Sequence, residues 1–139
     1  MMLDPTPIKL RDLHRISTKA AIFTPDYSHV LVMHMVPDTS PAIFGLPGGH
    51  MDKDEKPDET IVREIHEELG ITAPTLEHVD FFMHENGKIV LAYKGTLPLD
   101  SEFQPSNPAK EVGEWLTKSE FKAIAIEPGY KRLVLEHWQ

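Results

Sequence analysis

Short apolar runs, separated by segments rich in proline, glycine and polar residues, divide this chain into predicted strands and helices. Apolar runs of four to nine residues bounded by turn formers are typical of strands. They occupy residues 18–23, 29–36, 42–46, 76–84 and 88–97. The first two flank a polar turn at residues 24–28, which predicts a hairpin. The last two flank Glu85-Asn86-Gly87, which is a stronger hairpin signal.

One segment instead has the period of an amphipathic helix. Ile61, Ile65 and Leu69 recur every four residues and would form a buried stripe. Pro57 suits a first helical position, because its missing N–H would have no helical partner there. Gly70 can take the left-handed conformation that ends a helix. The pattern therefore predicts a helix that runs from about Pro57 to Leu69.

Two further helices are predicted near the C-terminal end. Thr117 and Glu120 have the spacing of a capping box, which would begin a helix with Phe121 facing inward. A proline-glycine pair then breaks this helix, and residues 130–138 predict another. Strands, helix, hairpin and helix in this order are typical of a layered α/β (α+β) fold. A chain of 139 residues has the length of one domain, so we expect a single domain over residues 1–139.

Composition narrows the classes of function. The chain has 22 acidic and 14 basic residues and a net charge of −8, so it is a poor candidate for binding nucleic-acid polymers. It has no cysteine, which excludes disulfides, thiolate zinc sites and a cysteine nucleophile. No apolar run is long enough to span a bilayer, and the first 15 residues lack the core of a signal peptide. We therefore expect a cytoplasmic protein with no membrane partner.

The predicted helix also brings acidic side chains together. Glu64 and Glu68 are four residues apart and Glu67 is three from Glu64, so their carboxylates share one face. Repulsion among them would destabilise a bare helix. A hard divalent cation would relieve it, and Mg²⁺ is usually held by a few carboxylates together with substrate phosphates. The alternative is an ordinary solvated helix face.

The segment that contains this helix carries a specific motif. Residues 49–71 read GHMDKDEKPDETIVREIHEELGI and match G-x5-E-x7-R-E-U-x-E-E-x-G-U at every position, where U is a bulky aliphatic residue. This motif resembles the Nudix box, the loop and helix that hold divalent metals against a diphosphate in Nudix hydrolases. Leu46-Pro47-Gly48 extends the resemblance. The resemblance implies a Nudix-type α/β/α sandwich with a mixed β-sheet, and a Mg²⁺ cofactor for which Mn²⁺ can substitute.

The same resemblance implies roles for individual residues. Glu64, Glu67, Glu68 and the carbonyl of Gly48 are the expected metal ligands. Arg63 is expected to orient or pair with these carboxylates.

The loop before the helix offers two further candidates. We expect Glu55 to bond back to Arg63 and hold the loop. His50 is either a phosphate contact or an exposed loop histidine.

The base that activates water is open to more than one assignment. In the family it is sometimes a glutamate of the box, here Glu64, and sometimes a glutamate in a loop well downstream. Glu111 and Glu114 precede Trp115 in a segment similar to that downstream loop, although fewer residues separate them from the tryptophan than is common. We favour Glu111, with Glu64 as the candidate inside the box. An ordinary solvated loop carboxylate is the alternative for either downstream residue.

The resemblance implies a Mg²⁺-dependent hydrolase of a pyrophosphate linkage in a nucleoside diphosphate joined to another moiety. Its partner would be a small-molecule nucleotide. Two alternatives use a similar site: a catalytically silent domain that binds a nucleotide as a sensor, and an isomerase of isoprenyl diphosphates. The intact box argues against the first, and the short chain without cysteine argues against the second.

The substrate itself is not predicted by the motif. We expect specificity residues in the loops at residues 39–44 and 98–108, because loops on a rigid scaffold usually carry recognition. Arg11, Arg15 and Lys19 are further candidates for contact with a phosphate or a partner. Many members of the family are homodimers, so a homodimer is a possible assembly.

Overall fold

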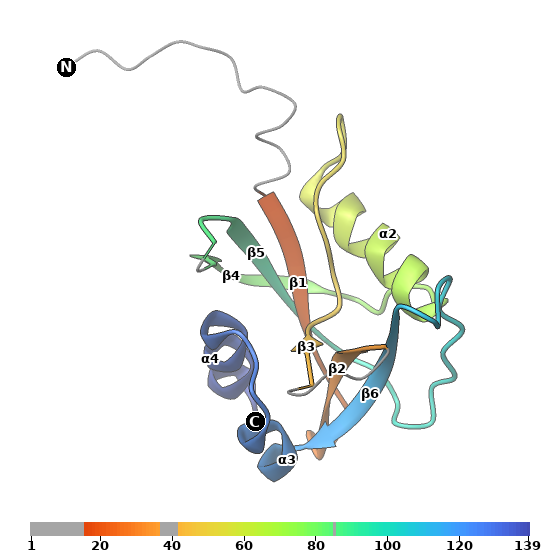
Figure 1. Ribbon diagram of the computed structural model, residues 1–139, viewed down its shortest axis with the longest axis vertical. Coiled ribbons are helices and arrows are strands. Elements are labelled where there is room, and N and C mark those ends of the chain that lie inside the picture. Colours follow the sequence, from red (N-terminus) through yellow and green to blue (C-terminus); the bar gives the residue numbers. More distant parts are fainter. Residues whose placement is uncertain (1–15, 37–41, 85) are drawn as a thin grey trace, which may run out of the picture.

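The computed structural model describes residues 16–36, 42–84 and 86–139 of the chain (Figure 1). Its elements are β1 (Ile16–Phe23), β2 (His29–Met35), β3 (Phe44–Gly45), α2 (Pro57–Leu69), β4 (Glu77–Met83), β5 (Ile89–Thr96), β6 (Glu111–Thr117), α3 (Lys118–Ala123) and α4 (Pro128–His137). No helix in this described part is long and apolar enough to cross a membrane.

The central helix has the bounds that its sequence predicts. α2 begins at Pro57 and ends at Leu69, and Gly70 closes it with a left-handed φ of 69° and an N–H that donates to the carbonyl of His66. The capping box at Thr117 is also present and begins α3. These boundaries are predictable because each depends on a residue within one turn of the helix end.

The strands agree less well with their predicted ranges. The strand expected at residues 42–46 shortens to Phe44–Gly45, and the segment expected to be a loop around Glu111 forms β6 instead. The β1–β2 hairpin is paired only close to its turn, at Phe23 and Val30.

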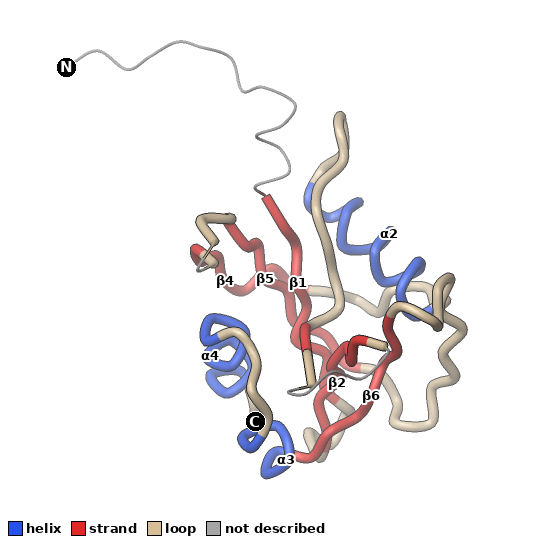
Figure 2. Tube along the Cα trace, viewed as in Figure 1, coloured by secondary structure: helices blue, strands red, loops and turns tan. Residues whose placement is uncertain are grey.

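The strands form one mixed sheet. Their order is β3-β2-β1-β5-β4, and β6 pairs along β2. β1 and β5 are parallel over eight residue pairs, whereas the other neighbours are antiparallel. Figure 2 shows the sheet between α2 on one side and α3 and α4 on the other. The predicted α/β/α sandwich with a mixed sheet is therefore confirmed.

Two hydrophobic cores hold these layers together. Ala20 and Ile22 of β1 belong to the core beneath α2, while Ala21 and Phe23 belong to the core beneath α3 and α4. This alternation follows from the strand geometry, in which successive side chains point to opposite faces. β1 thus lies at the centre of the molecule and contributes to both cores.

The segment before α2 takes the place of a strand beside β1. The N–H of Thr18 donates to the carbonyl of Gly49 and the N–H of Ala20 donates to that of Pro47, both at 2.8 Å. Because β2 leaves β1 soon after their turn, this edge of β1 is open to the loop. The glycines that precede α2 are consequently fixed against the middle of the sheet.

Candidate functional site

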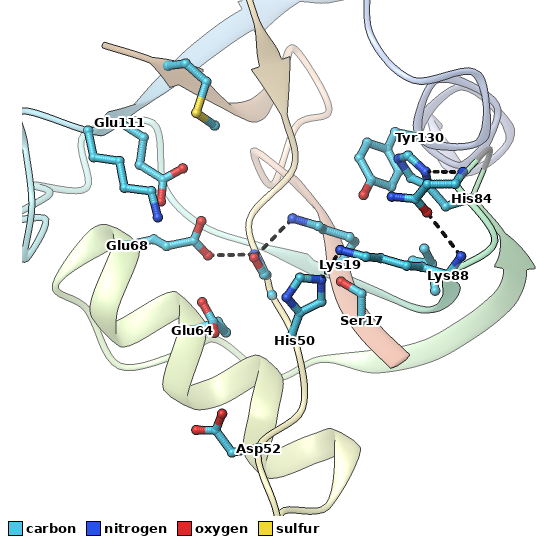
Figure 3. A pocket seen from close by; sticks show the side chains of 16 residues that line it. Ser17, Lys19, His50, Asp52, Glu64, Glu68, His84, Lys88, Glu111 and Tyr130 are labelled. Atoms are coloured by element: carbon cyan, nitrogen blue, oxygen red, sulfur yellow. Dashed lines mark hydrogen bonds between the residues drawn. The ribbon is translucent and has the colours of Figure 1, made fainter. Parts of the chain in front are cut away.

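A cavity of about 550 Å³ opens where this loop, α2, β1, the β4–β5 turn and α4 meet (Figure 3). On one side lie the carboxylates of Glu64, Glu68 and Glu111, which we call the acidic wall. Across from them lie Lys19, His50 and Lys88, which we call the basic wall. The cavity therefore has three carboxylates on one side and Lys19 and Lys88 on the other, while Lys110, next to Glu111 in the sequence, also lines it.

Gly48 connects the two walls through its backbone. Its N–H donates to Oε1 of Glu68 at 2.7 Å, and its carbonyl accepts from Nζ of Lys19 at 3.1 Å. Its φ of 132° and the closeness of the Thr18 backbone leave no room for a Cβ atom. Glycine is therefore required at this position, where the carbonyl is an expected metal ligand.

Glu68 is the most deeply placed member of the acidic wall, with 8% of its surface exposed. Burial raises its pKa to about 8, although the charge of Lys19 and the N–H of Gly48 act in the opposite direction. Burial also lowers the pKa of Lys19, and the neighbouring carboxylates, Glu68 first, oppose that shift. A carboxylate in this position gains strongly from a nearby positive charge.

Arg63 joins several parts of the loop and helix. Its Nε donates to Glu55 at 2.7 Å, its Nη1 donates to Glu64 at 3.0 Å and to Glu67 at 3.2 Å, and its Nη2 donates to the carbonyl of His50 at 3.0 Å. The expected contacts of Arg63 with Glu55 and with the box carboxylates are thus present. The hydrogen bond from Arg63 holds the pKa of Glu55 at about 2.

Glu64 lies between Arg63 and the second glycine of the loop. A Cβ atom at Gly49 would meet the Glu64 carboxyl group, so a larger residue there would displace this side chain. Burial raises the pKa of Glu64, and the charge of Arg63 opposes the shift.

Glu111 and Glu114 have different surroundings, although both lie on β6. Glu111 is opposite Met35 at the start of β6 and lines the cavity with Glu64 and Glu68. Glu114 has its Oε2 3.0 Å from Nδ1 of His34, leaves 44% of its side chain exposed, and is not a lining residue of this cavity. The expectation that these glutamates lie in a loop is wrong, because pairing with β2 makes the segment a strand.

Glu67 lies at the rim of the acidic wall, with half of its side chain exposed. It lines a second, smaller cavity of about 220 Å³ together with the acidic wall. Part of the expected specificity loop contributes to the same cavity through Pro105, Ser106 and Asn107.

The donors at these two cavities suit a hard cation, because they are carboxylate and carbonyl oxygens. Within the described ranges, no three acidic or histidine side chains already converge on one point that could hold an ion. Glu67 is held by Arg63 and would have to rotate to join Glu64 and Glu68. The residues therefore fit a divalent metal by their chemistry, provided that these side chains rearrange.

The basic wall contains one residue, Lys88, that the sequence analysis did not single out. Lys19 was a candidate for phosphate contact and does line the cavity, but Lys88 carries no local signal beyond its place after a hairpin turn. His84, Asn86 and Tyr130 line the same end of the cavity. Arg11, Arg15 and residues 39–41 of the other specificity loop lie outside the described residues.

Comparison with known proteins agrees with this architecture. A family model described as the NUDIX domain matches residues 13–136. A putative 8-oxo-dGTP diphosphatase 3 of Mycobacterium tuberculosis is 34% identical over 98 residues, which cover 63% of this chain and 43% of that protein. An 8-oxo-dGTP diphosphatase of Haemophilus influenzae is 26% identical over 89 residues, which cover 64% of this chain and 65% of that protein.

A solved structure shows the same fold at low sequence identity. The NUDIX domain of Shewanella oneidensis NrtR, in a cocrystal with ADP-ribose, matches with a TM-score of 0.73 and 19% identity. The match covers 96% of this chain and 90% of that chain. Because the family model covers most of the sequence and the box residues meet at one cavity, the chain belongs to the NUDIX domain family.

Proposed function

We propose that this protein is a Mg²⁺-dependent hydrolase that cleaves a pyrophosphate linkage in a nucleoside diphosphate joined to another moiety. The observation that carries the proposal is the acidic wall, which faces a cavity of about 550 Å³ together with the Gly48 backbone. A cavity of this volume suits a nucleotide. The matched M. tuberculosis and H. influenzae proteins are named as diphosphatases of a nucleotide, which supports the same type of bond as the target.

Glu64, Glu67, Glu68 and the Gly48 carbonyl would hold the metal. When bound, a divalent cation polarises the phosphoryl oxygens and lowers the pKa of a coordinated water. Arg63 keeps Glu55 and the box carboxylates in a common arrangement, so it acts as a positioning residue.

A carboxylate of the chain would accept the proton of the attacking water. The water oxygen forms a bond to one phosphorus while the bond from that phosphorus to the bridging oxygen breaks, and the bridging oxygen leaves with the other phosphate. Glu111 lines the cavity from β6 and is the preferred acceptor of the water proton. Glu64 is the second candidate.

The test compares wild type with Glu68→Gln. Release of phosphate or pyrophosphate would be measured over a panel of nucleoside triphosphates and nucleoside diphosphate derivatives, with Mg²⁺ or Mn²⁺ and with EDTA. We expect metal-dependent turnover that falls at least about a hundredfold in Glu68→Gln. The fold should survive this change, because a glutamine oxygen can still accept from the Gly48 N–H.

Glu77→Gln is the matched control, because Glu77 is exposed on β4 and the substitution removes the same charge. Near-native turnover in Glu68→Gln would contradict the metal assignment. No turnover by wild type, with binding of a nucleotide from the panel, would instead favour the sensor alternative.

A further inference from the structure

The basic wall contains a contact between two groups far apart in the sequence. Nζ of Lys88 lies 2.6 Å from Nε2 of His50, although 38 positions separate the two residues. An ammonium can only donate, so His50 accepts through Nε2. Lys88 and His50 thus meet on one side of the cavity. Lys88 comes from the β4–β5 turn, and His50 comes from the loop before α2.

The turn that carries Lys88 is held by its own hydrogen bonds. The Lys88 N–H donates to Oδ1 of Asn86, and the Lys88 carbonyl accepts from the His84 N–H at 2.7 Å. The Asn86 N–H donates in turn to Nδ1 of His84. These bonds fix the backbone from which the Lys88 side chain extends into the cavity (Figure 3).

Among the described residues, no carboxylate pairs with the charge of Lys88. A second cation lies on the same wall: burial lowers the pKa of Lys19, and the charge of Lys88 adds to that shift. Lys19 is already bonded to the carbonyls of Leu46 and Gly48. An anion between the two ammonium groups would relieve their repulsion.

We propose that Lys88, which His50 holds in place, binds a phosphate of the substrate that lies away from the acidic wall. The inference rests on the proposed function and refines it, because the moiety joined to the nucleoside diphosphate would itself be a phosphate. A nucleoside triphosphate can place a charged terminal phosphate against Lys88. A nucleoside diphosphate joined to an uncharged sugar has no third phosphate to place there, so Lys88 favours triphosphates.

The kinetic test uses Lys88→Gln, with Lys94→Gln as the matched control. Lys94 lies on β5, which follows Lys88, but its ammonium is 5.2 Å from the centre of the Tyr27 ring and it does not line the cavity. With dGTP as the probe, we expect the KM of Lys88→Gln to rise about tenfold while kcat changes little. With ADP-ribose, KM should stay within about twofold, and Lys88→Arg should recover most of the affinity for dGTP.

A second measurement does not depend on turnover. Binding of inorganic tripolyphosphate would be measured by calorimetry in EDTA at low ionic strength, where charge contacts are least screened. We expect the Kd of Lys88→Gln to be at least about fivefold higher than that of Lys94→Gln. Equal Kd values for the two variants would overturn the subsite.

The two readouts also separate the two proposals. If wild type hydrolyses neither nucleotide but the tripolyphosphate difference is present, the hydrolase proposal fails and the phosphate subsite stands. If dGTP is hydrolysed and Lys88→Gln has the same KM as Lys94→Gln, the hydrolase stands and the selection of triphosphates by Lys88 is wrong.

Discussion

The two walls of the cavity are built in different ways. The acidic wall is braced by the backbone: Gly48 donates to Glu68, Gly49 packs against Glu64, and Arg63 joins the helix to the loop. In the basic wall, Lys19 donates to two backbone carbonyls, whereas Lys88 is held by a single side-chain contact, with His50. The first arrangement constrains main chain and side chain together, whereas the second leaves two flexible groups in contact.

Because of this difference, we expect the braced residues of the acidic wall to affect the stability of the fold, and Lys88 to affect the choice of ligand. Changes at the residues that brace the acidic wall, Gly48 and Arg63, should lower the stability of the fold as well as alter the chemistry. Changes at Lys88 should alter ligand binding with little effect on folding, because its side chain is neither buried in a core nor bonded to the backbone of another element. The following substitutions test how far the acidic wall depends on its bracing.

The largest effect is expected from Gly48→Ala. The φ of 132° and the contact with the Thr18 backbone both oppose a Cβ atom, so the free energy of unfolding should fall by about 3 kcal/mol. Urea denaturation followed by circular dichroism measures this loss. Gly45→Ala is the control, because nothing lies within 4 Å of a Cβ atom there, and it should cost less than about 1 kcal/mol. Equal losses in both variants would contradict a special role for Gly48.

An intermediate effect is expected from Arg63→Gln. The substitution removes hydrogen bonds to several carboxylates and to the His50 carbonyl, so it should cost about 1–2 kcal/mol in the same denaturation assay. Arg132→Gln provides the comparison, since Arg132 also pairs with two carboxylates but is more exposed. Its loss should stay below about 0.5 kcal/mol. A loss for Arg63→Gln no larger than that for Arg132→Gln would mean that the contacts of Arg63 add no more stability than an exposed ion pair.

The smallest effect is a pH dependence that comes from Glu55. Arg63 lowers the pKa of Glu55 from 4.5 to about 2, so the folded state binds this proton less readily than the unfolded state. The resulting stability is fully present above about pH 4.5 and is lost as the pH falls towards 2. The difference in urea midpoint between wild type and Glu55→Gln should therefore shrink over that window. A difference that stays constant would show that the Glu55–Arg63 pair does not contribute.

The sequence predicted the acidic wall better than the basic wall for a physical reason. Glu64 and Glu68 lie on one helix whose start and end depend on Pro57 and Gly70, so local spacing alone brings them together. Lys88 meets its partner only because β1 and β5 pair in parallel and the loop lies along β1. A contact between residues this far apart in the sequence leaves no local sequence pattern from which it could be predicted.

β6 was missed for a similar reason. Its sequence contains Gly113 and two glutamates, which are weak strand formers, and its conformation is decided by seven residue pairs with β2. The same pairing places Glu111 and Glu114 in different surroundings, and the spacing in the sequence could not show which of them would line the cavity. Glu111 meets the acidic wall at the end of the strand, while Glu114 faces His34.

The pairings of β1 with β5 and of β2 with β6 also govern how the molecule forms. Each joins residues that are separated by more than half of the chain. During synthesis, the two central strands and the glutamate-rich helix leave the ribosome well before the strands that complete their sheet. Contacts of such long range slow folding, because loop closure comes before any gain from pairing. The cavity therefore cannot be complete until β6 and α4 have been made, and a nascent chain carries Glu64 and Glu68 before it has the strand that places Glu111 beside them.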